Sequence, residues 1–163
     1  MILHYFKRNE NKDKKIAKDQ YKKILEISKI FINQNNLFIV KNYNTSFEIV
    51  TIFIIFHIKL NLSKLNRSRS LKINEYLISI FVSDLDESLR AKGIGDMSIG
   101  KYVKSYVKKF YFRLSLFPKI YDFKKKDSLV PYFENIKIEG STNYSKLSTI
   151  MNDKYSDLLK KNI

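Results

Sequence analysis

The sequence predicts an all-α fold, a single-domain bundle of about five to six helices. Only 4 glycines and 2 prolines occur among 163 residues, too few turn formers for a many-stranded β sandwich or barrel. Apolar residues recur at helical intervals in several long segments. They make up 44% of the sequence, enough for one hydrophobic core in a chain of this length.

The first predicted helix covers residues 13–31. Apolar residues recur there near the helical period, at Ile16, Ala17, Tyr21, Ile24, Ile27 and Phe31. Residues 1–12 are mostly polar and are expected to form a disordered N-terminal tail, with the helical domain covering 13–163. Residues 33–45 are rich in asparagine and are expected to form a loop.

The second predicted helix is strongly apolar. We expect Ser46 to cap it, and we expect it to end near Lys64. The apolar run at 47–62 is interrupted by polar residues, including His57, which is interpreted as a packing residue. A membrane-spanning helix needs about 20 apolar residues, so this one is predicted to be a buried core helix. Residues 66–70 are expected to form a basic connection.

The third predicted helix covers residues 71–91. Its apolar stripe has the spacing of one helix face: Ile73, Tyr76, Leu77, Ile80 and Phe81. At about 100° per residue, Asp84 continues that stripe. An unpaired carboxylate is costly to bury, so Asp84 is expected to have a partner. Asp86 points elsewhere and precedes Arg90 by four residues, the favourable order for an ion pair within a helix.

A double-glycine turn follows. Gly93 and Gly95 are expected to end the third helix, because glycine adopts the left-handed cap conformation at little cost. Asp96 or Ser98 is then expected to cap a fourth helix.

The fourth helix is expected to stop at Phe117, because the residue before Pro118 is disfavoured in helical conformation. Its apolar stripe consists of Ile99, Val103, Val107, Phe110, Leu114 and Phe117. A short helix is predicted within 129–138 and a last helix over 144–160.

The net charge of +15 has an ambiguous meaning. Of the 31 basic residues 26 are lysines, and the chain is also rich in isoleucine and asparagine. This blend is typical of a genome-wide base-composition bias, although dispersed lysines still raise non-specific affinity for polyanions. Residues 98–126 hold nine basic residues against Asp122 alone. A basic ribosome- or RNA-binding module is therefore the alternative function.

The residue types argue against an enzyme and against a metal site. There is no cysteine, and the two histidines, His4 and His57, lie far apart in the sequence. No ligand pattern supports haem, and no cofactor is expected. Asp84 and Asp86 point to different faces of one helix, so they do not form a catalytic carboxylate pair.

One motif nearly matches a phosphate-binding loop. Gly95 is followed by Gly100 and Lys101 at P-loop spacing, but Tyr102 stands where the magnesium-binding Ser or Thr belongs. The preceding segment is predicted to be a helix, whereas a P-loop follows a strand. Nucleotide hydrolysis is therefore not expected.

The segment 84–104, DLDESLRAKGIGDMSIGKYVK, strongly resembles the signature of the ubiquinol–cytochrome c chaperone family. That signature has an acidic pair, a Leu-Arg, a Gly-Val-Gly-Asp-like turn and a Val-Gly-Lys-x-Val-Lys helix start. A looser resemblance covers 21–133. Upstream, the chain lacks the Gly-Arg pair that the family often has. Residues 45–47, Thr-Ser-Phe, stand at that place in this sequence. The matching positions are Asp84, Asp86, Leu89, Arg90, Gly93, Ile94, Gly95, Asp96, Ile99, Gly100, Lys101, Val103 and Lys104.

The resemblance implies a non-catalytic assembly factor. It would handle nascent or newly inserted cytochrome b during biogenesis of ubiquinol–cytochrome c reductase, the cytochrome bc complex. The mitochondrial relatives bind near the ribosome exit and act with a small partner protein, so both are implied partners. We expect a cytoplasmic, bacterial-type location with peripheral contact to the inner membrane.

The surface around the double-glycine turn is the predicted client-binding site. The resemblance selects its residues: Asp84, Asp86, Arg90, Gly93, Gly95, Asp96, Gly100, Lys101 and Lys104. Aromatic residues outside the apolar stripes, Tyr102, Tyr111 and Phe112, are candidates for a client-binding patch.

Overall fold

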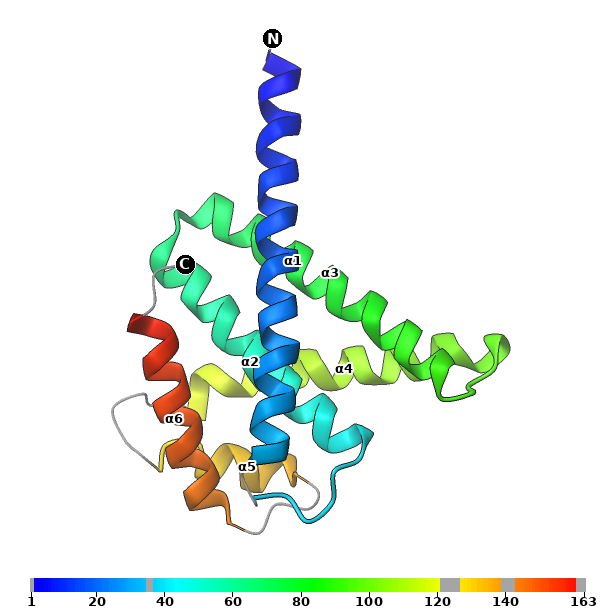
Figure 1. Cartoon of the computed structure of the whole chain (residues 1–163), viewed down its shortest axis with the longest axis vertical. Coiled ribbons are helices and arrows are strands. Elements are labelled where there is room, and N and C mark those ends of the chain that lie inside the picture. Colours follow the sequence, from blue (N-terminus) through cyan, green and yellow to red (C-terminus); the bar gives the residue numbers. More distant parts are fainter. Residues whose placement is uncertain (1, 35–36, 121–126, 139–142, 161–163) are drawn as a thin grey trace. The chain divides into compact units, whose positions relative to one another are not determined.

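The computed structural model describes residues 2–34, 37–120, 127–138 and 143–160. These residues form six helices and no strand (Figure 1). The predicted all-α class is confirmed, and the helix number lies within the predicted range. In chain order the helices are α1 (Ile2–Gln34), α2 (Tyr43–Lys64), α3 (Arg67–Ala91), α4 (Asp96–Ile120), α5 (Val130–Ile136) and α6 (Tyr144–Lys160).

The chain divides into two compact units. The first unit contains Met1–Leu25 and His57–Phe110, and the second contains Glu26–Phe56 and Tyr111–Ile163. Helix α3 belongs to the first unit, and α5 and α6 belong to the second. Helices α1, α2 and α4 contribute residues to both units. The predicted division into a tail at 1–12 and one domain at 13–163 stays a prediction.

The first unit combines apolar packing with a buried polar network. Its apolar core draws on α1, α3 and α4, as in the ring pair of Phe81 and Phe110, whose centroids lie 5.1 Å apart. Beside this core, the amides of Gln20, Asn61 and Asn74 are buried and bonded to one another over 2.7–3.2 Å. Because these side chains come from α1, α2 and α3, the network satisfies buried polar groups and fixes three helices together.

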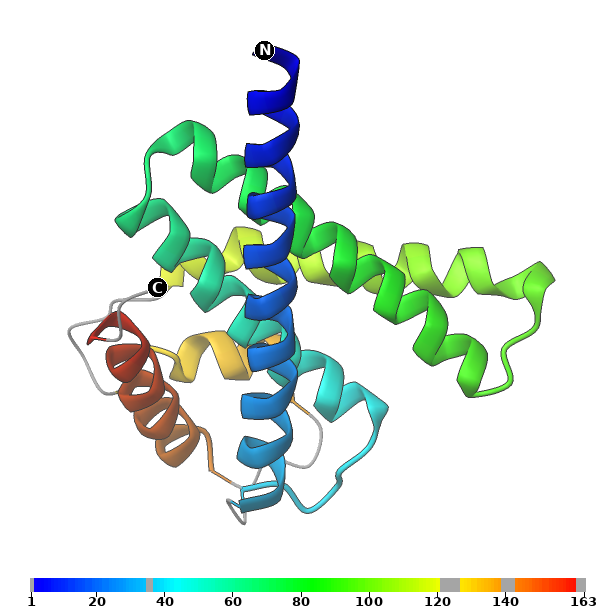
Figure 2. The same cartoon turned by 45° about the horizontal axis from the view of Figure 1, so that its top comes forward.

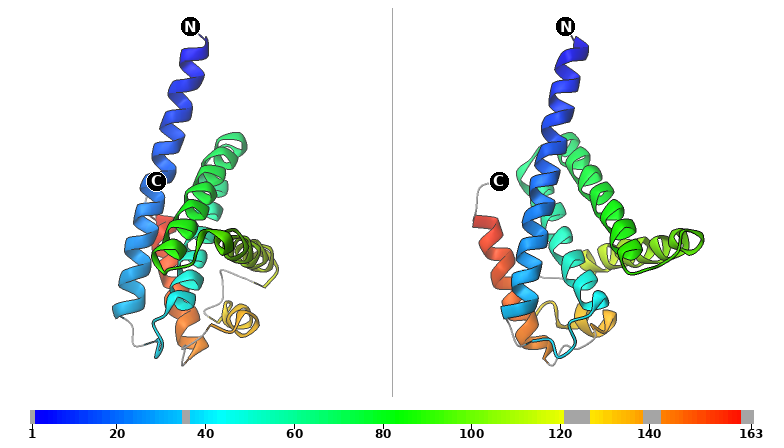
Figure 3. Two further views of the ribbon diagram at one scale, coloured as in Figure 1. Left: turned by 90° about the vertical axis from the view of Figure 1, so that its right-hand side faces the viewer. Right: turned by 45° about the vertical axis from the view of Figure 1, so that its right-hand side comes forward.

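The second unit has an aromatic core. The ring of Phe56 lies 5.8 Å from those of Phe53 and Phe117 and 4.7 Å from that of Tyr155. All three pairs are edge-on or tilted, the arrangement that aromatic quadrupoles favour. Helices α5 and α6 pack against each other (Figure 3). The Ser148 hydroxyl accepts a 3.1 Å hydrogen bond from the Leu129 amide.

Helix α2 is long and apolar enough, by length and composition alone, to cross a membrane. Of its most apolar 18-residue window, 78% is buried within the protein, which agrees with the predicted core helix. His57 is buried, as expected for a packing residue.

Two helix starts differ from those predicted. Helix α2 begins at Tyr43, and its cap is Asn42 rather than Ser46: the amide of Thr45 donates a 2.9 Å hydrogen bond to Asn42 Oδ1. Helix α3 begins at Arg67, so most of the predicted basic connection is its first turn. The cap there is Asn66, which accepts a 2.9 Å bond from the Arg69 amide. Asparagine is among the best capping residues, so Asn42 and Asn66 set these two boundaries.

The remaining boundaries differ modestly. Helix α1 begins at Ile2 instead of near Asp13 (Figures 1 and 3). Helix α4 continues through Pro118 to Ile120, whereas the prediction ended it at Phe117. Proline lacks an amide proton and strains a helix interior. Helix α4 accordingly ends two residues after Pro118.

Candidate functional site

The end of α3 is closed by a Schellman motif. Gly93 has a φ of 85°, in the left-handed region that favours glycine. Its amide donates to the carbonyl of Arg90 over 2.8 Å, and the Ile94 amide donates to the carbonyl of Leu89 over 3.3 Å. This bond pattern satisfies the last free carbonyls of a helix. The predicted role of Gly93 is confirmed.

Gly95 has a different role from the one predicted. Gly93 is the glycine with positive φ among the described residues, and Gly95 is not in that region. Its carbonyl instead accepts the first helical bonds of α4, from the amides of Ser98 and Ile99 over 2.9 and 3.1 Å. Gly95 is therefore the N-cap, and the predicted cap at Asp96 or Ser98 is wrong. Asp96 is the first helical residue, where a negative charge suits the helix dipole.

Arg90 links the two helices across the turn. Its Nε lies 2.7 Å from Asp86 Oδ2, which confirms the predicted pair within α3, and its Nη1 is bonded to Asp96 on α4. The hydrogen bond to Asp86, and after it the one to Asp96, raises the pKa of the Arg90 guanidinium. All three side chains are exposed to solvent, where an ion pair contributes little stability. Their arrangement orients the turn more than it stabilises the fold.

Asp84 has the partner that its position requires. Asp84 Oδ2 accepts a 2.6 Å hydrogen bond from the hydroxyl of Tyr21, a buried residue of α1. Because Asp84 bonds to Tyr21 while Asp86 bonds to Arg90, the two carboxylates are engaged separately. This separation agrees with the expectation that they are not a catalytic pair.

Helix α4 follows directly after the turn that ends α3 (Figure 2), and its first turns carry both apolar and charged residues. Ile99 is buried and anchors it, whereas Lys101 and Lys104 are exposed. Met97 is fully exposed, and Tyr102 is 47% exposed. Exposed apolar and cationic side chains therefore occur together in the first turns of α4. We call this surface, formed by Met97, Lys101, Tyr102 and Lys104, the α4 face.

All nine predicted site residues lie in the first unit, within α3, the turn or α4. The structure brings Asp86, Arg90 and Asp96 together and places Asp84 against α1. Tyr111 and Phe112 are each half exposed as well, but they belong to the second unit. The guanidinium of Arg113 lies 5.6 Å from the centre of the Phe112 ring.

The family model for the ubiquinol-cytochrome C chaperone matches residues 38–129, more than half of the chain. The match contains the whole turn and the α4 face. The chain belongs to the ubiquinol–cytochrome c chaperone family. The family recognised from the segment 84–104 is therefore confirmed.

A solved structure supports the fold over nearly the whole length. The crystal structure of the Cbp3 homolog from Brucella abortus is similar with a TM-score of 0.72 and 21% sequence identity. The alignment covers 99% of this chain and 90% of that chain. No curated protein matches this chain.

The near-P-loop of this family member is not a phosphate-binding loop. The segment that begins at Gly95 follows helix α3 rather than a strand, and Gly100 and Lys101 lie inside α4. Their amides are therefore not arranged as a loop around a phosphate. Within the described part of the chain, no group of three His, Cys, Asp or Glu residues could hold a metal ion.

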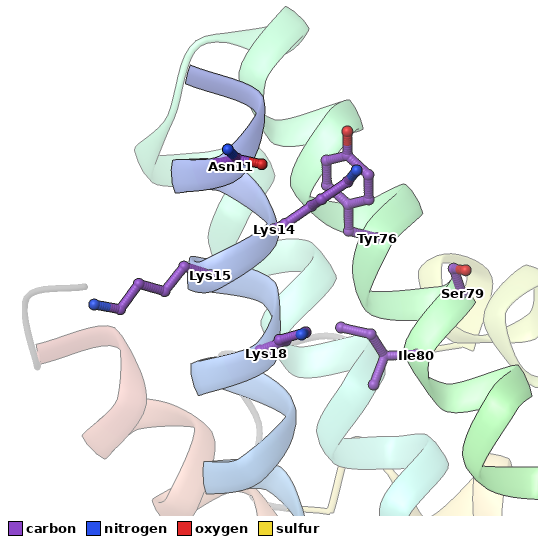
Figure 4. A pocket seen from close by; sticks show the side chains of 7 residues that line it. All are labelled: Asn11, Lys14, Lys15, Lys18, Tyr76, Ser79 and Ile80. Carbon is purple, nitrogen blue, oxygen red and sulfur yellow. The ribbon is translucent and has the colours of Figure 1, made fainter. Parts of the chain in front are cut away.

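The sequence did not reveal a pocket in the first unit. This pocket of about 520 Å³ lies between α1 and α3 (Figure 4). In Figure 4 Lys14 extends to Tyr76 and Lys18 points toward Ile80, while Lys15 points away. Lys14 Nζ also lies 3.0 Å from a carboxylate oxygen of Glu10, so its charge is already balanced. The lining residues are Asn11, Lys14, Lys15, Lys18, Tyr76, Ser79 and Ile80.

The second unit contains a buried ion pair that was also missed. The guanidinium of Arg113 donates two hydrogen bonds to the Glu48 carboxylate, over 2.8 and 3.1 Å. Both side chains are nearly buried, at 12% and 11% exposure. Glu48 was detectable, since an acid within an apolar run needs a partner. Its partner in α4 was not, because 65 residues separate the two.

Proposed function

We propose that this protein is a non-catalytic chaperone that holds cytochrome b during assembly of the cytochrome bc complex. The observation that carries the proposal is the family match over residues 38–129, which contains the α4 face. The turn beneath that face is closed by backbone bonds and oriented by Arg90. The chaperone therefore presents a preorganised surface, which lowers the entropic cost of binding.

The chemistry of the α4 face suits an unassembled membrane protein. Met97 is flexible and polarisable and can adapt to different apolar segments. Tyr102 offers a large contact area with a polar tip. Lys101 and Lys104 complement acidic residues or lipid phosphates that flank such segments. The client contacts the chaperone in the cytoplasm, at the surface of the inner membrane.

Two further partners belong to this proposal. A ribosome contact would place the chaperone beside nascent cytochrome b, and a small partner protein would share the client. The basic segment 98–126 supports the ribosome contact through its charge. Residues 121–126, which contain part of this charge, lie outside the described residues.

The test is affinity capture from the cells that make the protein. A tagged chain should enrich cytochrome b over an untagged control, and replacing both Met97 and Tyr102 by Asp should abolish the enrichment. Leu159→Asp is the matched control, because Leu159 is 40% exposed on α6, in the other unit. Capture of ribosomal proteins without cytochrome b would refute the client and favour the RNA-binding alternative.

A further inference from the structure

The pocket between α1 and α3 lies wholly within the first unit and has no part in the proposed client site. Its volume of about 520 Å³ is within the usual range for small-molecule sites, about 300–1,000 Å³. Helix α1 contributes four lining residues and α3 contributes three, each set at the spacing of a single helix face. The pocket is therefore a groove between two facing helix surfaces (Figure 4).

Two side-chain bridges join α1 to α3, one near each end of this groove. The hydroxyl of Tyr76 donates a 3.2 Å hydrogen bond to Glu10 Oε1. The hydroxyl of Tyr21 donates a 2.6 Å bond to Asp84, one turn beyond the last lining residue of each helix. Between these bridges the lining covers residues 11–18 of α1, a length of about 10 Å at 1.5 Å per residue. This length suits a small molecule rather than a long polymer.

The two lysines that extend into the groove differ in how their charges are balanced. Lys14 Nζ lies 3.0 Å from a carboxylate oxygen of Glu10 and 5.3 Å from the centre of the Tyr76 ring. Lys18 points toward Ile80 instead (Figure 4). Among the residues that the structure describes, none forms an ion pair or a hydrogen bond with the Lys18 ammonium group.

The acids nearest to Lys18 do not neutralise it. Asp84 accepts its hydrogen bond from Tyr21, and it forms no ion pair with Lys18. Asp19 follows Lys18 in the sequence but projects from α1 about 100° further around the helix. Lys15 adds positive charge and points away from the groove in Figure 4. A ligand with one negative charge would therefore complement the Lys18 ammonium group.

The groove beside Lys18 is apolar. Ile80 and Tyr76 are both half-buried, so part of each side chain still faces solvent. The aliphatic stems of the lysines add apolar surface around them. Burying this surface against a hydrocarbon group is favourable. The groove thus combines one cation with apolar walls, and a ligand that matches it has an anionic group on a hydrocarbon body.

We propose that this groove binds a small amphiphilic anion, a hydrocarbon chain that carries one carboxylate or phosphate group. The anionic group pairs with Lys18, and the chain lies against Ile80 and the ring of Tyr76. A fatty acid and a single-chain phospholipid share this chemistry. The site goes beyond the chaperone function and does not depend on it.

The experiment is calorimetric titration of the full-length protein with octanoate, octanol and acetate. Octanoate has both features of the ligand, whereas octanol lacks the charge and acetate lacks the chain. Octanoate should bind at one site, about fivefold or more tightly than either of the others, because it alone makes both contacts. Octanol or acetate binding as tightly as octanoate would overturn the proposal.

Lys18→Gln tests the contact with the anionic group. This variant should bind octanoate about fivefold more weakly than the wild type and should bind octanol equally well. Lys23→Gln is the matched control, because Lys23 is exposed on α1, does not line the groove and faces away from it. The control should keep its octanoate affinity within about twofold of wild type. An equal loss in both variants would reveal attraction to the general positive charge and overturn the proposal.

Ile80→Ser tests the apolar wall. It should weaken the binding of octanoate and octanol alike, by about fivefold, because both lose the same hydrocarbon contact. Leu71→Ser is the matched control, since Leu71 is 54% exposed on α3 and does not line the groove. A thermal melt verifies that each variant is folded, and Lys18→Gln at an exposed position decides the case if Ile80→Ser unfolds. Unchanged affinity in a folded Ile80→Ser variant would overturn the proposal.

A last titration identifies the source of the anionic group. Octyl phosphate replaces the carboxylate of octanoate by a phosphate on the same chain. Tighter binding of octanoate assigns the groove to fatty acids, and tighter binding of octyl phosphate assigns it to single-chain phospholipids. Either result supports the site if Lys18→Gln removes the preference for the anion over octanol. A preference that survives in Lys18→Gln places the anion elsewhere and overturns the proposal.

Discussion

The hydroxyl of Tyr21 on α1 donates a 2.6 Å hydrogen bond to Oδ2 of Asp84 on α3. Asp84 belongs to the family signature, but Tyr21 lies outside the range 38–129 that the family model matches. The hydrogen-bond donor to this signature carboxylate therefore comes from α1, which lies outside the segment that the family model matches. This bond gives Asp84 a structural role, because it joins α3 to α1.

We expect Tyr21→Phe to lower the free energy of unfolding by about 1.5 kcal/mol, because it removes a hydrogen bond to a charged group. A double-mutant cycle with Asp84→Asn should give a coupling of about 1 kcal/mol. Denaturant unfolding measures both. Tyr102→Phe, on an exposed side chain, should change stability by less than about 0.5 kcal/mol. A coupling near zero would contradict the role assigned to this bond.

Replacing each of the three glycines around the turn by alanine should change the free energy of unfolding by a different amount. Gly93→Ala should cost about 1 kcal/mol, because Gly93 has a φ of 85°. Gly95→Ala should cost only about 0.5 kcal/mol: an added Cβ meets nothing within 4 Å, but alanine is a poorer N-cap residue than glycine. Gly100→Ala should stabilise by up to about 1 kcal/mol, because Gly100 lies inside α4 with open space around it. Thermal melts check this order, which a larger loss at Gly95 than at Gly93 would contradict.

The ion pair of Glu48 and Arg113 should be sensitive to loss of one partner. Arg113→Met leaves a nearly buried carboxylate unpaired and should cost about 3–5 kcal/mol. Adding Glu48→Gln removes that charge and should recover part of the loss. Chemical denaturation of the single and double variants measures the difference. If the single variant is as stable as the double one, Glu48 is hydrated rather than buried.

Tyr132 offers a substitution that should not destabilise. Its hydroxyl is buried and has no hydrogen-bond partner among the residues that the structure describes, and burial raises the pKa of the phenol. Tyr132→Phe removes the unsatisfied group while keeping the ring that packs on Phe117. We expect the free energy of unfolding to stay equal or rise by about 1 kcal/mol. A clear loss in a urea titration would reveal a hydrogen bond to this hydroxyl in solution.

The lysines of the α4 face test the client site. Lys101→Glu with Lys104→Glu should leave the melting curve nearly unchanged, because both side chains are exposed. Cells carrying the variant should accumulate less cytochrome bc complex, since charge complementarity is reversed. Haem b absorbance in membranes measures the complex. Normal accumulation would move the client site to Met97 and Tyr102.

Local signals in the sequence determined the fold class and the family. Helical periodicity and the scarcity of glycine and proline are short-range properties, and they predicted helices without strands. The segment 84–104 identified the family because its signature is contiguous. The same locality explains the correct cap at Gly93 and the pair of Asp86 and Arg90, which lie four residues apart. Asn42 and Asn66 were also local signals, but Ser46 was predicted to cap the second helix, and the third helix was predicted to begin at residue 71.

Tertiary structure decided which distant residues meet. Asp84 needed a partner, but only packing selected Tyr21, 63 residues away. The same holds for Glu48 with Arg113, and for the amide network that joins Gln20 to Asn61. A helical period shows which side of a helix is buried and not which helix lies against it. The side chains that complete each buried polar group therefore depend on how helices pack, which no single segment encodes.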